Sequence, residues 1–174
     1  MKDNKYNNKK LLLIAPLFFG YYKEILKEAE NMGMEADYIC DAPSNTNLSK
    51  AVARINKSFI KGATRKYYEK NVYPVVCAKQ YDYVLLVAGM TFAFFPNMVR
   101  EIRECQKKAR FVMYQWDSEE NLPYSTHIHK YFDDIYTFDR IDSGNDSKYK
   151  FLPLFYTRLY EKASKSNEKA EYDC

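Results

Sequence analysis

Short apolar runs alternate along this chain with longer segments in which apolar residues recur at helical spacing. Runs at 10–16, 83–89 and 111–115 are almost wholly apolar and are closed by proline, glycine or polar residues. Runs of this kind are typical of strands that are buried on both faces of a parallel sheet. Further strands are predicted at 35–41, 134–138 and 151–154.

The segments between the strands predict helices. Helices are expected at 21–32, 48–79 and 96–108, with a short helix or loop at 124–131 and a turn at 143–146. Gly33 suits the carboxyl end of the first helix. In the long second region, Gly62 is expected to break the helix and Pro74 to kink it.

Strands that alternate with helices at this spacing predict an α/β fold. We expect one domain with a doubly wound, mostly parallel, Rossmann-like three-layer sheet of five or six strands and right-handed crossovers. Residues 1–9 read as a disordered polar tail, 10–156 as the domain, and 157–174 as a linker or surface helix.

Composition narrows the class of protein only a little. The net charge of +4 permits contact with phosphates or an anionic membrane and requires neither. Four cysteines without a C-x-x-C pair argue against structural zinc and suggest a reducing compartment. The longest apolar run, 11–20, is too short to span a bilayer, and no small-residue cleavage site follows it. A cytoplasmic location is expected, with peripheral contact at the inner face of the membrane as an alternative.

Two common nucleotide-binding motifs are missing from the sequence. The turn after the first strand reads PLFFG and not G-x-G-x-x-G, and no G-x-x-x-x-G-K-[ST] occurs. Without these backbone cradles for phosphates, a dehydrogenase or a P-loop NTPase is disfavoured. No cofactor is expected.

Polar residues follow the strand at 111–115, in the stretch FVMYQWDS. Open parallel sheets bind ligands beyond the carboxyl ends of their strands, so Trp116, Asp117 and Ser118 are candidate site residues. Asp117 could equally cap a short helix together with Glu120, and Trp116 could simply fill the core. Other candidates at strand ends are Phe19, Gly20, Gly89, Thr91, Asp139, Arg140 and Asp142. An internal ion pair is the plain alternative for Asp139 and Arg140.

Basic residues concentrate in the long helical region at 50–70. Its cations are Lys50, Arg54, Lys57, Lys61, Arg65, Lys66 and Lys70. A solvated helix face is the simplest explanation; peripheral membrane contact is the main alternative, and nucleic-acid binding is disfavoured. His127 and His129 are two residues apart, a spacing that does not share a helix face, so no metal site is expected.

Six segments occur in a familiar order: KKLLLIAPLFFGYYKEILKEAENMG, DAPSN, YDYVLLVAG, FVMYQWDS, IYTFDRID and FLPLFY. Together they resemble the N-terminal half of CgeB-like, glycosyltransferase-like proteins of bacterial polysaccharide biosynthesis, over residues 10–156. The resemblance implies the acceptor-side half of a GT-B enzyme for capsule, lipopolysaccharide or exopolysaccharide.

This resemblance also implies a site and partners. Asp117, or else Asp139, would be the base that deprotonates a sugar or lipid-linked acceptor, and Trp116 or Phe19 would shape the acceptor site. A nucleotide-sugar donor is expected for the complete enzyme, without a metal. By the same resemblance the donor half would be missing from this chain, and residues 157–174 would be the linker to that second domain or its start. A truncated product, or a partner chain that supplies the donor half, is therefore expected.

The alternative class is a non-catalytic Rossmann-like binding or regulatory domain that acts through a partner. A phosphorylated receiver would need paired acids after the first strand and an aspartate after the third. Those places hold Pro16 and the pair Ala88-Gly89. A flavodoxin would need a Ser/Thr-rich loop where Leu17-Phe18-Phe19 stand. Both specific versions are disfavoured.

Overall fold

The computed structural model describes residues 6–43, 61–90, 92–157 and 160. Six strands form one sheet in the order β2-β1-β3-β4-β5-β6, and every neighbouring pair is parallel. The strands are β1 (Lys10–Ala15), β2 (Glu35–Cys40), β3 (Tyr83–Ala88), β4 (Arg110–Gln115), β5 (Asp134–Thr137) and β6 (Tyr149–Phe151). The predicted fold class is confirmed.

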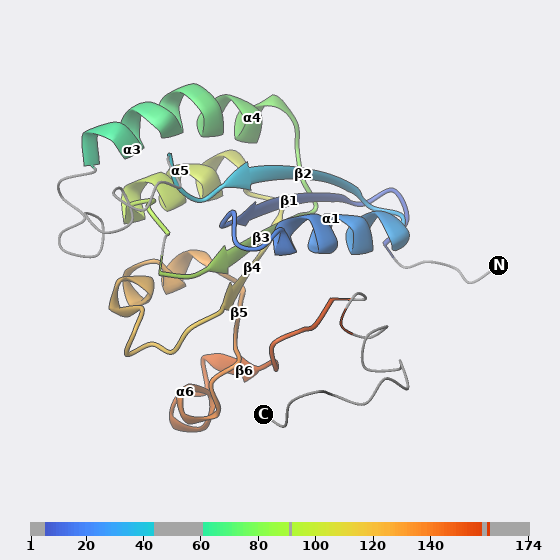
Figure 1. The fold of residues 1–174 in the computed structure, drawn as a ribbon. Coiled ribbons are helices and arrows are strands. Elements are labelled where there is room, and N and C mark those ends of the chain that lie inside the picture. Colours follow the sequence, from blue (N-terminus) through green and yellow to red (C-terminus); the bar gives the residue numbers. More distant parts are fainter. Residues whose placement is uncertain (1–5, 44–60, 91, 158–159, 161–174) are drawn as a thin grey trace.

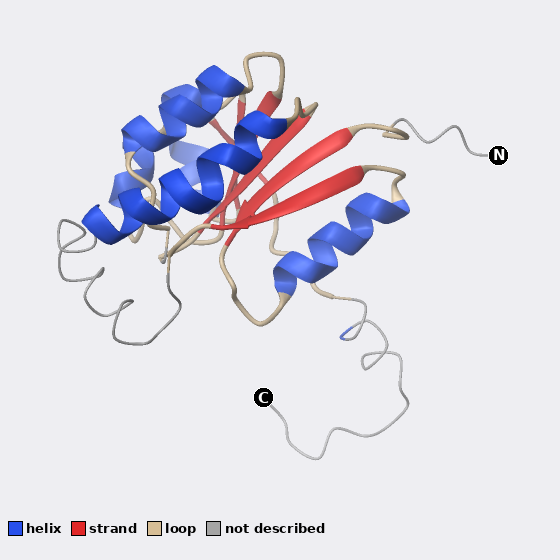
Figure 2. Cartoon of the chain, turned by 90° about the horizontal axis from the view of Figure 1, so that it is seen from above, coloured by secondary structure: helices blue, strands red, loops and turns tan. Residues whose placement is uncertain are grey.

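Helices lie on both faces of the sheet (Figures 1 and 2). They are α1 (Tyr21–Asn31), α3 (Lys61–Tyr67), α4 (Tyr73–Ala78), α5 (Pro96–Cys105) and α6 (Arg140–Asn145). A π-helical segment, Tyr68–Val72, joins α3 to α4, and two 3-10 helices, Pro123–His127 and His129–Tyr131, precede β5. Helix α1 covers one face of the sheet, whereas α3, α4 and α5 cover the other. No helix among the described residues is both long and apolar enough to cross a membrane.

The strand order places a topological switch point between β1 and β3. From β1 the chain runs first outward to β2 and then back across β1 to β3, so connections leave the two central strands in opposite directions. Ligands of open α/β sheets bind at this point, beyond the carboxyl ends of the strands. The segments after β1, β3 and β4 therefore define the edge where a site is expected.

Side chains on each central strand alternate between two apolar layers. In β1, Leu12 and Ile14 enter the larger core beneath α4 and α5, while Leu13 and Ala15 enter a smaller cluster beneath α1. The smaller layer leaves part of its face open. A groove of about 830 Å³ lies there, lined by Leu85, Val112 and Phe155 among others.

Two predicted elements near the carboxyl end were wrong. Residues 143–145 belong to α6 and do not form a separate turn, and Asp146 follows the end of the helix. The helix begins at Arg140 because the Asp139 carboxylate accepts hydrogen bonds from the backbone N–H groups of Ile141 and Asp142. Strand β6 spans Tyr149–Phe151, two residues earlier than expected, and residues 152–154 have no regular structure.

The long helical region differs in detail from its prediction. Gly62 lies inside α3, and the described helix continues through it. Before Pro74 the chain adopts the π-helical segment, where proline's missing N–H leaves the regular helical ladder interrupted. Residues 48–60 of the predicted helix lie outside the described residues.

Two cysteines are joined, although the sequence suggested a reducing compartment, where disulfides are rare. Cys77 in α4 and Cys105 in α5 form a disulfide with Cα atoms 5.8 Å apart. The pairing could not be predicted because 28 residues separate the two, and only tertiary packing of α4 on α5 brings them together. Cys40 is half-buried at the end of β2.

Candidate functional site

The turn between β1 and α1 exposes three consecutive apolar side chains. Leu17, Phe18 and Phe19 are 45%, 49% and 85% exposed. Phe19 adopts φ 44° and Gly20 φ 75°, so a phenylalanine occupies the left-handed region that favours glycine. The turn is closed by hydrogen bonds from the Phe18 N–H to the Pro16 carbonyl and from the Tyr21 N–H to the Phe18 carbonyl.

This turn continues into a connected set of aromatic rings at the carboxyl edge of the sheet. The Phe18 ring lies 4.5 Å from Phe19 and 6.1 Å from Tyr21, measured between centroids. Tyr21 in turn contacts Trp116 at 5.9 Å and Phe155 at 5.6 Å. We call this surface the aromatic patch; its members are Leu17, Phe18, Phe19, Tyr21, Trp116 and Phe155.

Trp116 anchors the aromatic patch to the sheet. Its backbone N–H donates to the Ala88 carbonyl at 2.9 Å, so it extends the pairing of β4 with β3 by one residue. Its ring packs edge-on against Tyr21 and Tyr114. The indole Nε1–H is buried and has no hydrogen-bond partner among the described residues. A buried donor without a partner is uncommon in native proteins and is available to an acceptor on a ligand.

Asp117 and Ser118 stabilise a turn and start no helix. The Asp117 carboxylate accepts from the Asn121 side-chain amide at 2.7 Å and from the Ser118 N–H at 3.1 Å. The Ser118 carbonyl accepts from the N–H groups of Asn121 and Leu122. The predicted helix cap with Glu120 is therefore wrong, because residues 119–121 form a turn.

Asp139, Arg140 and Asp142 follow β5, and each makes a different structural contact. Asp139 caps α6, while the Arg140 guanidinium lies over the Phe151 ring at 4.4 Å, so the alternative of an Asp139–Arg140 ion pair is not realised. Asp142 accepts from the Glu119 N–H at 2.8 Å. Burial, with the nearby Asp139 and Glu119 charges, raises the pKa of Asp142 above its usual range.

At the switch point itself the groups are mainly backbone carbonyls and a tyrosine. The Gly89 carbonyl accepts from the Phe92 N–H and from the Tyr124 hydroxyl. Burial, with the charges of Asp41 and Asp117 nearby, raises the pKa of Tyr124, so its hydroxyl remains a donor at neutral pH. Asp41 is fully buried at the end of β2. The candidate Thr91 lies outside the described residues.

His127 and His129 differ in their surroundings and share no site. His127 is exposed, whereas His129 is half-buried with its Nε2 3.0 Å from Gln115 Oε1 and its ring edge-on to Tyr149. Among the described residues, no group of three or more His, Cys, Asp or Glu side chains is arranged to hold a metal ion.

Part of the basic region is neutralised by neighbouring acids. Arg65 forms ion pairs with Glu69 at 2.7 Å and with Glu101 at 3.0 Å. Residues 50–60 of this region lie outside the described residues. Contact with a membrane or a nucleic acid through this region stays a prediction.

Comparison with known proteins gives only distant structural neighbours. No protein-family model matches the chain, and no curated protein matches it. One similar solved structure is a response regulator from Burkholderia pseudomallei that holds a phosphorylated aspartic acid, a calcium ion and citrate. Its TM-score is 0.46 at 10% identity, and the match covers 75% of this chain and 59% of that one.

Two further neighbours have the same character. A response regulator from Thermotoga maritima gives a TM-score of 0.40 at 12% identity, covering 90% of this chain and 96% of its own. The receiver domain of a histidine kinase from Arabidopsis thaliana gives 0.36 at 16% identity, covering 72% and 79%. All three scores lie below 0.5, so none of these proteins assigns a role to a residue of this chain.

The resemblance to CgeB-like glycosyltransferases was wrong. The structural neighbours reported above are receiver domains and response regulators, and neither a family model nor a curated protein supports a glycosyltransferase. Three expectations depended on this resemblance and are withdrawn. They are the acceptor-side role, the assignment to polysaccharide, capsule or lipopolysaccharide biosynthesis, and the role of Asp117 or Asp139 as a base for sugar transfer.

Sequence reasoning missed four of the six members of the aromatic patch. Phe19 and Trp116 were candidates, but Leu17, Phe18, Tyr21 and Phe155 were not. A signal was present: apolar residues stand consecutively at 17–19 and at 155–156, beyond the ends of the predicted strands. Their meeting depends on the path of the chain after β6, which only the structure supplies.

Proposed function

We propose that this chain is a non-catalytic binding domain that acts through a protein partner, which it recognises with the aromatic patch. The observation that carries the proposal is Phe19, which is 85% exposed and held at φ 44°. An exposed aromatic ring and a left-handed non-glycine backbone both raise the free energy of the isolated chain. Strained backbone and exposed apolar surface are both found preferentially at binding sites.

The acids at this edge of the sheet argue for binding and against catalysis. Asp117 is held by Asn121, Asp139 caps α6, and Asp142 accepts from the Glu119 N–H. Each carboxylate is thus occupied by a structural contact. We also expect no phosphorylation of the receiver type, because Pro16 and Gly89 directly follow β1 and β3 and present no carboxylate there. Acetyl phosphate should therefore not phosphorylate the chain, and beryllofluoride should not change its conformation.

A protein partner suits the aromatic patch in two respects. Aromatic side chains are enriched among the residues that dominate binding energy at protein interfaces. Most of the patch lies on the turn between β1 and α1 and at Phe155, after β6. A partner can therefore cover it without opening the core.

Site-specific photocrosslinking in the source cells tests the proposal. A photoreactive phenylalanine at Leu17, 45% exposed, is compared with one at Tyr73, 42% exposed. Tyr73 belongs to α4, which covers the face of the sheet opposite to α1. We expect a discrete adduct from position 17 that is missing from position 73. With the purified partner, Phe19→Ala should weaken binding about tenfold, whereas Tyr73→Ala should leave it unchanged. Equal labelling at both positions, or no discrete adduct, contradicts the proposal.

A further inference from the structure

We propose that Cys77 and Cys105 are a reversible redox pair, which exchanges with small disulfides of the glutathione type in the folded protein. The bond joins the carboxyl ends of α4 and α5, where the chain passes to the amino ends of β3 and β4. The aromatic patch lies at the carboxyl edge of the sheet. The two proposals therefore concern opposite edges and can fail independently.

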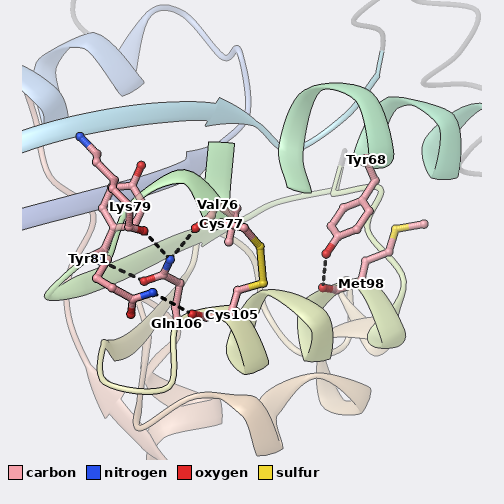
Figure 3. The surroundings of a disulfide bond; sticks show 9 residues. Tyr68, Val76, Cys77, Lys79, Tyr81, Met98, Cys105 and Gln106 are labelled. Carbon is pink, nitrogen blue, oxygen red and sulfur yellow. Dashed lines mark hydrogen bonds between the residues drawn. A yellow bond between two sulfur atoms is a disulfide. The ribbon is translucent and has the colours of Figure 1, made fainter. Parts of the chain in front are cut away.

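The geometry places the two sulfurs within reach of each other through packing alone. Cys77 lies in the last turn of α4 and Cys105 is the last residue of α5 (Figure 3). Their Cα atoms are 5.8 Å apart, inside the usual range for a disulfide. The helices are held side by side by a core that includes Val76 and Ile102, so the thiols stay paired in space when the bond is open.

The two cysteines differ in their access to solvent. Cys77 is exposed, whereas Cys105 is half-buried and packs against the main core. An incoming thiolate or small disulfide therefore reaches the Cys77 sulfur first. Thiol–disulfide exchange depends on such access, and exposed disulfides are the labile ones.

The same junction is stabilised without the disulfide. The Gln106 side chain donates to the Val76 and Lys79 carbonyls and accepts from the Tyr81 N–H (Figure 3). The Tyr68 hydroxyl donates to the Met98 carbonyl at 3.1 Å and ties the π-helical segment to α5. We therefore expect reduction to leave the fold intact, which a reversible pair requires.

The reaction proceeds by two exchanges, and the atoms balance. The Cys77 thiolate attacks glutathione disulfide, which forms a mixed disulfide and releases one glutathione thiolate. The Cys105 thiolate then attacks the Cys77 sulfur, which closes the protein disulfide and releases the second glutathione. The protons lost by the two cysteines end on the two released glutathiones. The protein is oxidised by two electrons and glutathione disulfide is reduced by two.

A glutathione titration of the full-length protein tests the proposal. Cys40→Ser with Cys174→Ser leaves only the pair, and the protein is equilibrated from both directions in mixtures of reduced and oxidised glutathione. Acid quenching, alkylation of free thiols and intact mass then give the oxidised fraction. We expect one reversible curve, unchanged far-UV circular dichroism, and a thermal midpoint about 5 °C higher in the oxidised form.

Two single variants report on the order of attack. Cys105→Ser leaves the exposed Cys77, which should accumulate one bound glutathione because no second thiol releases it. Cys77→Ser leaves Cys105, which should be modified about tenfold more slowly because of its burial. A bond that opens only after denaturation, or that never closes at any glutathione ratio, overturns the proposal. Equal rates for the two variants overturn it as well.

Discussion

The side-chain amide of Gln106 donates a hydrogen bond to the main-chain carbonyl of Val76, and so joins the end of α5 to the last turn of α4. The same fully buried side chain also donates to the Lys79 carbonyl at 2.8 Å and accepts from the Tyr81 N–H at 2.9 Å. An amide is suited to this place because it donates twice and accepts once from one planar group. Without the Gln106 side chain, the Val76 and Lys79 carbonyls and the Tyr81 N–H would lose this hydrogen-bond partner in the buried core.

Replacement of Gln106 by leucine should lower the free energy of unfolding by about 2–4 kcal/mol, because buried backbone groups lose their partners. Gln106→Glu is the matched control. It keeps the shape and the acceptor for Tyr81, but above its pKa it has no donor for the Val76 and Lys79 carbonyls. Urea unfolding should therefore show Gln106→Glu destabilised as well. A glutamate variant as stable as the parent would contradict this account.

Replacement of Phe19 by glycine should raise the free energy of unfolding by about 0.5–1 kcal/mol, because φ 44° carries no steric cost for glycine. Partner binding should be lost at the same time, since the exposed ring is removed. The neighbouring Phe18→Gly is the control. Phe18 does not have a positive φ, so the same change there should lower stability. If both glycine variants destabilise the protein equally, the strain at Phe19 is not real.

The sequence predicts those elements best whose formation depends on neighbouring residues alone. β1, β3 and β4 were predicted to within about a residue, because an apolar run with a clear stop records a strand buried on both faces. The turn predicted at 143–146 was wrong because residues 143–145 lie in α6, which Asp139 caps. Whether Asp139 pairs with Arg140 or caps a helix depends on three-dimensional positions.

Contacts over long distances in the sequence were out of reach. Phe155 meets Tyr21 across more than a hundred residues, and Cys77 meets Cys105 only because α4 packs on α5. The family resemblance failed for a related reason. Strand-end positions such as Gly89 and Trp116 are shared by doubly wound sheets in general, so the series of segments indicated a fold and no chemistry.

Stability should fall as the pH is lowered from about 6.5 to about 4. Burial of the ring, with the positive charge of Lys148 nearby, lowers the pKa of His129 to about 4, although Glu119 and Asp146 oppose the shift. Below pH 6.5 the unfolded chain takes up a proton that the folded chain refuses, so protonation favours unfolding. The loss should be about 2 kcal/mol after allowance for solvent screening.

Urea unfolding over this pH range checks that expectation against two variants. His129→Gln can still donate to Gln115 Oε1 but does not titrate, so its stability should change less between pH 6.5 and 4. His127→Gln, at an exposed position, should behave as the parent does. Equal slopes for the parent and His129→Gln would show that other groups cause the pH dependence.

Fluorescence of the chain's single tryptophan should report directly on the aromatic patch. The Phe155 ring lies 5.8 Å from Trp116 and shields it from water. Phe155→Ala should therefore shift the emission of Trp116 to longer wavelength and increase its quenching by iodide. Phe151→Ala is the matched control, because Phe151 is equally exposed at 39% but stacks on Arg140. An emission shift of the same size in both variants would mean that residues 151–155 move as a whole and that Phe155 has no specific contact with Trp116.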